Sequence, residues 1–391
     1  MLAEIFWFCF LVCNLVYFLP SGTSADTDSP SQIIEIFRHG ARGPLTKYDQ
    51  SWLRSEWGQL TIPGVQQQYS LGKTLAQRYP NLLQNTSEIY FLSDDTPRCV
   101  QSAKIQLSGI QDFFNNKEES LNLFEINVVN ESNKHIFKRA HGSQCPNGYS
   151  WERANAKSAK SQEAWQIFKE TIDVINKALP EKNQLSSTFK IAVFGDALLV
   201  NIFHNRSLVP FGIEDAYIAK NFVHIFSWFV FNTEYGQEVQ KQISAFPLID
   251  EMLQQLEAFR KGEEHSKKAA LYSAHDYNIY AVLAAFGVIN EECIMANYLS
   301  SVRNETLPHP NCYFPFFASN LVVELYNQTK NPRDFPSTYV KVSYNYMALP
   351  LCNGQEVCEY NDFIEFAKKA IGNNTHESYT EKCNVKTKRT K

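Results

Sequence analysis

Arginine and histidine side chains crowd into one short stretch near the N-terminus. The sequence "QIIEIFRHGARGPLTKY" (32–48) places Arg38 directly before His39, and Arg42 three residues after it. Guanidinium groups form charge-assisted, often bidentate hydrogen bonds with phosphate oxygens. A neutral imidazole between them can attack phosphorus while the arginines hold the equatorial oxygens. The stretch therefore predicts an oxyanion site with His39 as nucleophile and Arg38 and Arg42 as phosphate ligands.

Attack at phosphorus also needs an acid that protonates the departing alcohol. Asp276, which follows a second imidazole at His275, is the candidate proton donor. Each feature alone has an ordinary structural explanation. An arginine after a strand often forms a surface ion pair, and Asp276 could cap the helix that starts there. The position of these residues after predicted strands favours the catalytic interpretation.

Three short apolar segments predict the strands that position these residues, at 32–37, 87–93 and 269–274. Each is followed by polar residues, Gly or Pro, and then by a helical pattern. This alternation predicts an α/β fold, with a mostly parallel sheet flanked by helices. Ligands bind beyond the carboxyl ends of such strands, where Arg98 also lies.

The middle of the chain reads differently. Segments 161–179 and 234–262 are amphipathic helical patterns, whereas 189–200 fits a strand or a helix equally well. We therefore predict a discontinuous α/β domain from residues 26–111 and 263–391. Residues 112–262 form a mainly α-helical domain inserted into it.

Composition and the N-terminus bound the cellular setting. The 391 residues are 44% apolar, and the net charge of -4 gives no reason to expect nucleic acid as a partner. The apolar run 5–19, followed by small residues up to Ala25, predicts a secretory signal at 1–25. An N-terminal anchor is the alternative, because Glu4 replaces the usual basic residues. No later segment predicts a membrane anchor in the mature chain.

Glycosylation sequons and cysteines support an oxidising compartment. Six N-x-S/T sequons occur, at Asn85, Asn130, Asn205, Asn304, Asn327 and Asn373. Seven cysteines remain after the signal, so at least one thiol is free or intermolecular. Cys352 and Cys358 flank a short turn and form a good local pair. The spacings match no zinc site, so we predict neither a metal nor another cofactor.

The ordered motifs resemble a known family. "RHGARGP" is similar to the R-H-G-x-R-x-P signature of the histidine acid phosphatases, and "SAHD" resembles their second signature. "WGQLTIPGVQQQYSLGKTLAQRY" and "SDDTPRCVQSA" resemble the family's segments between the two. The resemblance covers most of the mature chain and is strongest in 32–109 and 269–287.

The resemblance implies roles for single residues. His39 would become phosphohistidine, Asp276 would be the proton donor, and Arg38, Arg42, Arg98 and His275 would bind the phosphoryl group. It also implies metal-free hydrolysis of small phosphomonoesters by an α/β domain with an inserted helical domain. We therefore expect a secreted or lysosomal acid phosphatase.

The resemblance also bears on the cysteines. It makes Cys145–Cys383 a plausible long-range disulfide, and Cys293–Cys312 stays open. The family often has a cysteine before its late "L…ELY" strand, where this chain has Asn320. Cys99, beside Arg98 on the predicted helix, is the expected free thiol.

Several alternatives remain at this point. The chain could be a phytase or other inositol-phosphate phosphatase, or a lysophosphatidate phosphatase. "HDYN" is similar to a phytase motif, but no enrichment of Lys or Arg near the motifs favours phytate. A phosphate-binding protein without catalysis would need only the arginines, so His39 and Asp276 argue against it. The oligomeric state, including a homodimer, stays open.

Overall fold

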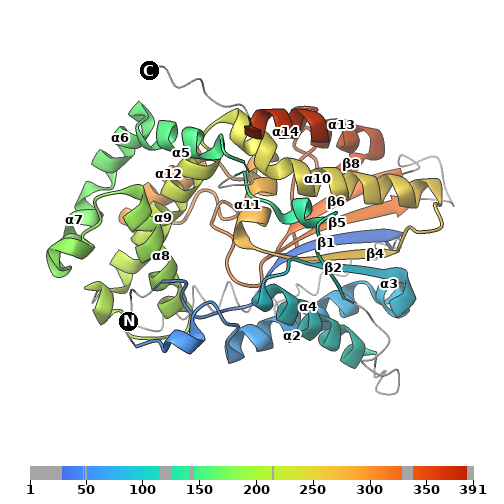
Figure 1. The fold of residues 1–391 in the computed structure, drawn as a ribbon, viewed down its shortest axis with the longest axis horizontal. Coiled ribbons are helices and arrows are strands. Elements are labelled where there is room, and N and C mark those ends of the chain that lie inside the picture. The colour runs from blue at the N-terminus through green and yellow to red at the C-terminus, as the bar shows by residue number, and fades with distance from the viewer. Residues whose placement is uncertain are drawn as a thin grey trace.

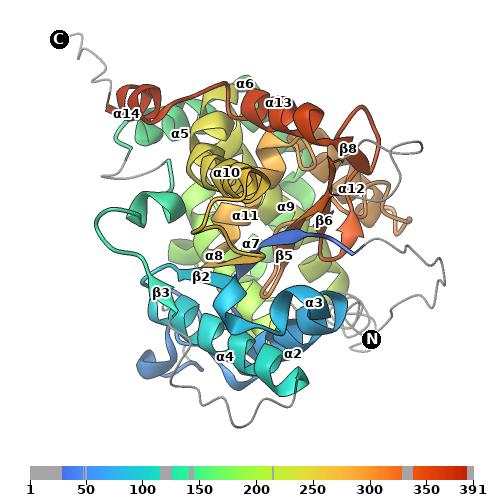
Figure 2. The same cartoon turned by 90° about the vertical axis from the view of Figure 1, so that its right-hand side faces the viewer.

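The computed structural model describes residues 29–46, 48, 51–114, 126–140, 145–213, 215–327 and 338–384. Within them, one mixed sheet carries helices on both faces, and further helices gather at one end of it (Figures 1 and 2). The predicted secretory signal lies outside the described residues.

The sheet has eight described strands. They are β1 (Gln32–Arg38), β2 (Ile89–Ser93), β3 (Asn127–Val128), β4 (Ala269–Ala274), β5 (Asn320–Asn327), β6 (Thr338–Tyr344), β7 (Met347–Ala348) and β8 (Val357–Glu359). Their order across the sheet is β3-β2-β4-β1-β5-β6-β7, and β8 pairs with β6. The three predicted strands are confirmed as β1, β2 and β4, which are direct neighbours.

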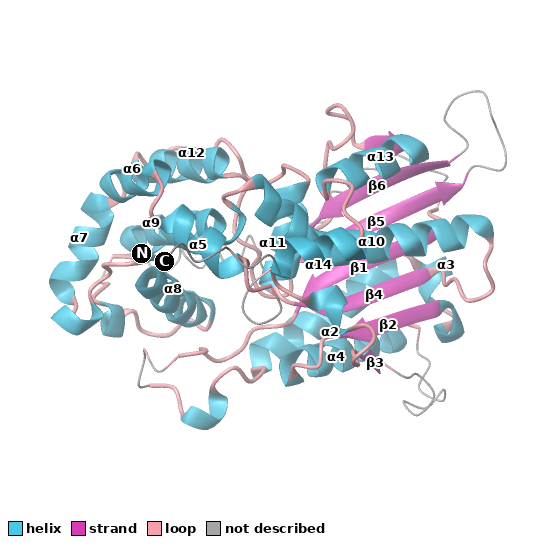
Figure 3. Cartoon of the chain, turned by 45° about the horizontal axis from the view of Figure 1, so that its top comes forward, coloured by secondary structure: helices cyan, strands magenta, loops and turns pink. Residues whose placement is uncertain are grey.

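Helices make up most of the rest. They are α2 (Ile62–Arg78), α3 (Pro80–Leu83), α4 (Pro97–Phe113), α5 (Gly148–Ala156), α6 (Ala159–Ile167), α7 (Lys169–Ala178), α8 (Thr188–Phe203), α9 (Ala216–Tyr235), α10 (Glu238–Lys261), α11 (Asp276–Ala285), α12 (Glu291–Val302), α13 (Tyr360–Ala370) and α14 (His376–Asn384). α2 and α4 cover one face of the sheet, and α10 and α13 cover the other (Figure 3).

The central strand β1 is buried on both faces, which explains its nearly continuous apolar sequence. Alternate side chains point to opposite sides. Ile33 and Phe37 join the core formed with α2 and α4. Ile34 and Ile36 join the larger core on the other face, which continues without a break into the helical section.

The α/β class with flanking helices is confirmed, but the sheet is mixed rather than mostly parallel. β4 pairs in parallel with both β1 and β2, and β2 pairs in parallel with β3. Parallel neighbours need such long crossover connections, which are helical here. β5 pairs antiparallel with β1, and β6, β7 and β8 continue antiparallel. β7 follows β6 after only Asn345 and Tyr346, both at positive φ, and such a tight turn must return the chain antiparallel.

Helices α5 to α9 and α12 lie beside the sheet rather than over it (Figure 3). The ambiguous segment 189–200 is helical and forms most of α8. α10 instead runs along the sheet face, although the predicted insertion 112–262 includes it (Figure 1). The exact domain boundaries therefore stay a prediction.

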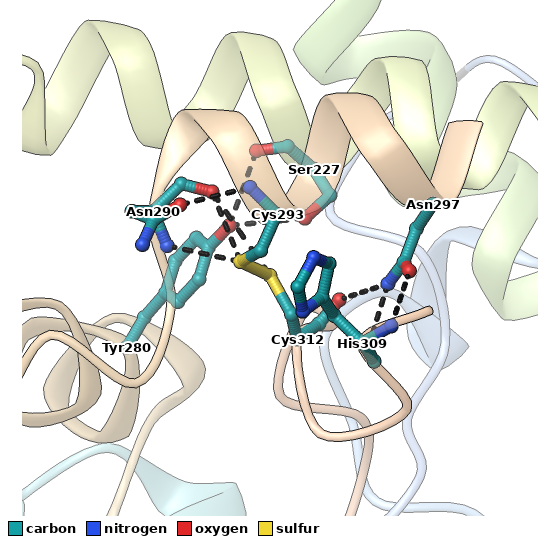
Figure 4. The surroundings of a disulfide bond; sticks show 7 residues. All are labelled: Ser227, Tyr280, Asn290, Cys293, Asn297, His309 and Cys312. Atoms are coloured by element: carbon teal, nitrogen blue, oxygen red, sulfur yellow. Dashed lines mark hydrogen bonds between the residues drawn. A yellow bond between two sulfur atoms is a disulfide. The ribbon is translucent and has the colours of Figure 1, made fainter. Parts of the chain in front are cut away.

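The cysteine pairing agrees with the sequence-based predictions. Cys145–Cys383, Cys293–Cys312 and Cys352–Cys358 are disulfides, and Cys99 is a buried free thiol. Figure 4 shows the surroundings of Cys293–Cys312. The Asn297 amide donates to the backbone oxygen of Cys312 at 3.0 Å, so side-chain hydrogen bonding supports the covalent link between α12 and the following loop.

One carboxyl group interrupts the apolar strand β1. Glu35 is fully buried, and it accepts hydrogen bonds from Gln106 and Asn320, both at 2.7 Å. Burial raises its pKa from 4.5 to about 7, although these two hydrogen bonds act in the opposite direction. Asn320 is the residue at the position where the family often has cysteine, and here it is a partner of this buried acid.

This raised pKa makes a prediction about stability. The folded state binds the Glu35 proton more tightly than the unfolded state does. The stabilisation that this proton gives the folded state is therefore fully present below pH 4.5 and is lost as the pH rises through about 7. The two pKa values correspond to a free energy of unfolding that falls by about 3 kcal/mol across this window. Urea denaturation at a series of pH values would measure it.

Glu35→Gln should flatten that pH dependence. The glutamine at position 35 cannot titrate. If the Gln106 amide flips, its Oε1 atom, which has no hydrogen-bond partner in the wild type, can accept a hydrogen bond from the new amide. The exposed Glu131→Gln is the matched control and should keep the wild-type profile. Equal pH profiles for wild type and Glu35→Gln would show that Glu35 does not control this stability.

Candidate active site

The carboxyl ends of three parallel strands form the site. Arg38 pairs in register with Ala274 of β4, and Ser93 of β2 pairs with Ser273. The backbone of His39 donates to the Ala274 oxygen at 3.0 Å, which extends this pairing by one residue. Residues that follow the three strands are therefore held side by side.

His39 is buried, with 1% of its surface exposed. Its Nδ1 lies 2.8 Å from the Gly40 oxygen. Because a carbonyl oxygen only accepts, Nδ1 carries the proton and Nε2 keeps its lone pair. Burial, followed by the charges of Arg38 and Arg98, lowers the His39 pKa well below its usual value. His39 is therefore a neutral imidazole with Nε2 available for attack.

A close backbone approach fixes the loop after His39. A Cβ on Gly40 would lie 2.3 Å from the Gly64 oxygen, and one on Gly64 would lie 2.1 Å from the Ala41 oxygen. Both positions therefore need glycine. The contact locks the start of α2 against the loop that carries His39 and Arg42.

Arg38 is held on several sides. It donates to the Pro315 oxygen at 2.7 Å and forms an ion pair with Asp276 at 2.7 Å. Its guanidinium lies 4.2 Å from the centre of the Phe317 ring, and that of Arg42 lies 5.6 Å from the same ring. Phe317, which no sequence motif indicated, thus supports both arginines.

Arg42 is fixed by an acid from the helical section. Asp196 on α8 accepts from its guanidinium at 2.6 Å, and the other carboxylate oxygen accepts from the Leu45 backbone at 2.9 Å. Sequence analysis missed Asp196, because its segment was ambiguous and 154 positions separate it from Arg42. A single acid within an apolar helix was the only available signal.

This contact predicts that Asp196 positions Arg42. Asp196→Asn keeps the shape but removes the charge, and we expect kcat/KM to fall by about tenfold to 10²-fold. Arg42→Lys, which loses the planar fork, should cost about 2–4 kcal/mol of transition-state stabilisation. Combining the two should cost less than the sum, because both disturb one contact.

Asp173→Asn provides the matched control for the Asp196 substitution. Asp173 pairs with Lys169 on the exposed face of α7, where an ion pair contributes little. Steady-state kinetics of the single and double variants would measure the coupling. Rates for Asp196→Asn within the range of this control would refute the positioning role.

Arg98 and His275 contact each other at 3.4 Å between Nη2 and Nδ1. Because arginine only donates, Nδ1 accepts, and the proton of His275 is on Nε2, 3.0 Å from Asp94. Burial raises the pKa of Asp94, but the hydrogen bond from His275 and other contacts outweigh this and lower it to about 2. Asp94 was not predicted. The role of His275 as a donor to phosphate stays a prediction, since its ring proton faces Asp94 here.

Asp276 is the first residue of α11, and its carboxylate faces Arg38. It also accepts a hydrogen bond from the Tyr277 backbone at 2.8 Å. The alternative structural role, a contact with the first turn of the helix, therefore describes part of its environment. Burial raises its pKa, but Arg38, Arg42 and His275 together outweigh burial and lower it. Asp276 is thus ionised in the ligand-free protein.

The six predicted site residues therefore meet in one place. The buried Nε atoms of Arg38, Arg42 and Arg98 have no hydrogen-bond partner in the structure. The charges of all three arginines act on the neutral His39, and such a concentration of positive charge favours an anionic ligand.

Comparison with known proteins identifies the family. Residues 31–345 match the model described as "Histidine phosphatase superfamily (branch 2)". The chain belongs to this superfamily. The histidine acid phosphatase resemblance is therefore confirmed, and so is the prediction of a phosphatase.

Two curated proteins that are similar to this chain are acid phosphatases. Lysosomal acid phosphatase of Xenopus laevis is 28% identical over 65% of this chain and 61% of that protein. Prostatic acid phosphatase of Rattus norvegicus is 23% identical over 88% of this chain and 89% of its own length. The chain thus spans less than two thirds of the frog protein but most of the rat protein.

Solved structures share the fold. The phytase of Citrobacter braakii superposes with a TM-score of 0.64, at 15% identity, over 92% of this chain and all of that chain. The Klebsiella sp. ASR1 phytase gives 0.60 at 14% identity, over 90% and 97% of the two chains. At this identity the likeness concerns the fold alone.

Proposed function

We propose that the chain hydrolyses phosphate monoesters through a phosphohistidine at His39. The observation that carries the proposal is the free Nε2 of a neutral His39 that lies among Arg38, Arg42 and Arg98. This arrangement matches what an incoming phosphate dianion requires.

The proposed reaction has two balanced steps. Nε2 of His39 forms a bond to phosphorus while the bond to the ester oxygen breaks, and Asp276 gives its proton to the departing alcohol. Water then attacks the phosphohistidine, Asp276 takes a proton from that water, and His39 leaves as inorganic phosphate is released. Arg38, Arg42 and Arg98 hold the equatorial oxygens in both steps.

The pKa of Asp276 must rise for the first step. In the free enzyme the surrounding cations keep it ionised. A bound phosphate dianion offsets their charge and raises the pKa of the acid, so substrate binding and protonation support each other. An acidic optimum is expected, because higher pH empties the proton-donor state.

Hydrolysis of phosphate esters should continue at the same rate when a strong metal chelator is added, because the charge that stabilises the phosphoryl group comes from arginines. The experiment measures purified protein against a panel of phosphate esters across pH, with and without a chelator. Loss of activity in the chelator, with recovery on adding zinc or magnesium, would contradict the mechanism.

The substrate panel also separates the remaining alternatives. Among the described residues, the side chains that contact Arg38, Arg42 and Arg98 are acidic, aromatic or imidazole, and none of these contacts is a lysine. A phytate leaving group carries further phosphates and would favour additional cations. We therefore propose small monoesters, and preferential turnover of phytate or lysophosphatidate in the panel would replace this assignment.

We also propose a secreted or lysosomal location. Three disulfides fit an oxidising compartment. The asparagines of all six sequons are exposed, so each could carry a glycan. Within the described residues, no helix combines the length and apolar character needed to cross a membrane. Treatment of the expressed protein with an N-glycosidase should lower its apparent mass, and size-exclusion chromatography would test the homodimer.

A further inference from the structure

A thiol, an imidazole and a carboxylate meet next to the arginines. Cys99 lies on α4, His275 follows β4, and Asp94 follows β2. The Cys99 sulfur is 3.6 Å from Nε2 of His275, which is 3.0 Å from Asp94 Oδ1. One donor atom from each residue lies within 4.8 Å of the other two, and this is the one such group among the described residues.

These separations are close to those of ligands around a tetrahedral ion. With Zn–S near 2.3 Å and Zn–N near 2.0 Å, tetrahedral sulfur and nitrogen ligands lie roughly 3.5 Å apart, and nitrogen and oxygen ligands roughly 3.4 Å apart. The observed distances are 3.6 Å and 3.0 Å. Two of the three separations therefore approach those of a tetrahedral site, and the third pair, the Cys99 sulfur and an Asp94 oxygen, lies within 4.8 Å.

The donor types select the class of ion. Thiolate and imidazole favour zinc, cadmium and similar ions, whereas magnesium prefers oxygen ligands only. The Cys99 sulfur now has a backbone oxygen, that of Ala274, at 3.5 Å, and its three neighbouring contacts include both ring nitrogens of His275. No described disulfide uses this thiol.

We propose that Asp94, Cys99 and His275 form an inhibitory site for a thiophilic divalent ion such as zinc. Binding removes the thiol proton of Cys99, so the thiolate and the Asp94 carboxylate balance the two positive charges. The ring proton of His275 moves from Nε2 to Nδ1, which frees Nε2 as a ligand. One proton is therefore released for each ion bound.

The same change disrupts phosphate binding. Nδ1 of His275 now accepts from Arg98. Once Nδ1 carries a proton it repels the Arg98 donor, and the ion adds a like charge beside the guanidinium. Arg98 must leave its position, so the site loses one of three cations that hold the phosphate. The inhibition rests on the proposed function, but ion binding itself does not.

The test uses the purified full chain with zinc or cadmium alone as the probe, in a buffer without chelator or phosphate. Zinc should inhibit turnover of nitrophenyl phosphate, and chelation should restore it. Cys99→Ser should need a roughly tenfold or higher zinc concentration for the same inhibition, because one ligand is lost. Magnesium at equal concentration should have no effect on either protein.

A readout without turnover separates this proposal from the proposed function. Cadmium should produce an ultraviolet thiolate-to-metal absorption band in wild type that is absent from Cys99→Ser. His265→Ala is the matched control, since His265 is exposed and pairs with Glu263 at 3.3 Å, and it should behave as wild type. Cys99→Ala replaces Cys99→Ser if the serine variant does not fold.

Two results would overturn the site: equal inhibition of wild type and of the folded Cys99 variant, or no cadmium band in folded wild type. A band without any phosphatase activity would leave the site standing and reject the proposed function instead.

Discussion

His39→Ala should give a folded protein that forms no phosphoenzyme and loses turnover by about 10⁴ or more. Nδ1 of the imidazole donates to the Gly40 oxygen, so the lone pair of Nε2 is the nucleophile that the substitution removes. Removing it leaves the arginines in place, so binding of inorganic phosphate should persist while chemistry stops.

Trapping the intermediate checks this result directly. Acid-labile, base-stable label from a radioactive phosphoester should appear on wild type after rapid quenching, and peptide mapping should place it on His39. His265→Ala, which changes an exposed histidine, should be labelled normally. Substantial turnover by His39→Ala would mean that water or another residue attacks phosphorus.

Asp276→Asn should slow alkyl phosphates by about 10²–10⁴, the usual range for general acid catalysis. The amide keeps the shape but has no proton to give. Nitrophenyl phosphate should be slowed clearly less, because nitrophenolate leaves without protonation. Inhibition by inorganic phosphate should be nearly unchanged.

The pH profile provides a second measure of Asp276. Its pKa is lowered in the free enzyme, so the protonated form is populated at low pH and is lost as the pH rises. Wild-type activity on alkyl phosphates should therefore fall on the alkaline side, and Asp276→Asn should lose that part of the profile. Equal slowing of both substrate types would leave Asp276 as a structural residue at the start of α11.

Local patterns were sufficient to predict the parts of the site that follow strands. β1, β2 and β4 are short apolar segments with clear ends, and each places its polar residues within a few positions of the last strand residue. The motif resemblance then assigned expected roles to six side chains. Both arguments depend on residues that are near one another in sequence.

Long-range partners could not be predicted in the same way. Asp196 meets Arg42 because α8 packs beside the loop after β1, and no local pattern encodes that packing. Asp94 was quoted within a motif, yet its bond to His275 requires β2 and β4 to be neighbours. The antiparallel half of the sheet was missed because it begins where β5 pairs with β1, which lies far earlier in the chain.

The central position of β1 has a consequence for biosynthesis. β1 is translated early, but its neighbours β4 and β5 begin at Ala269 and Asn320, so neither exists when β1 leaves the ribosome. The apolar strand must then stay unpaired while more than half of the chain is made. Exposed strand edges of this kind aggregate readily and attract chaperones. Because the backbone of His39 docks on Ala274, the nucleophile reaches its working position only after α10 and β4 have been synthesised. The reactive centre therefore assembles only after most of the chain has been synthesised.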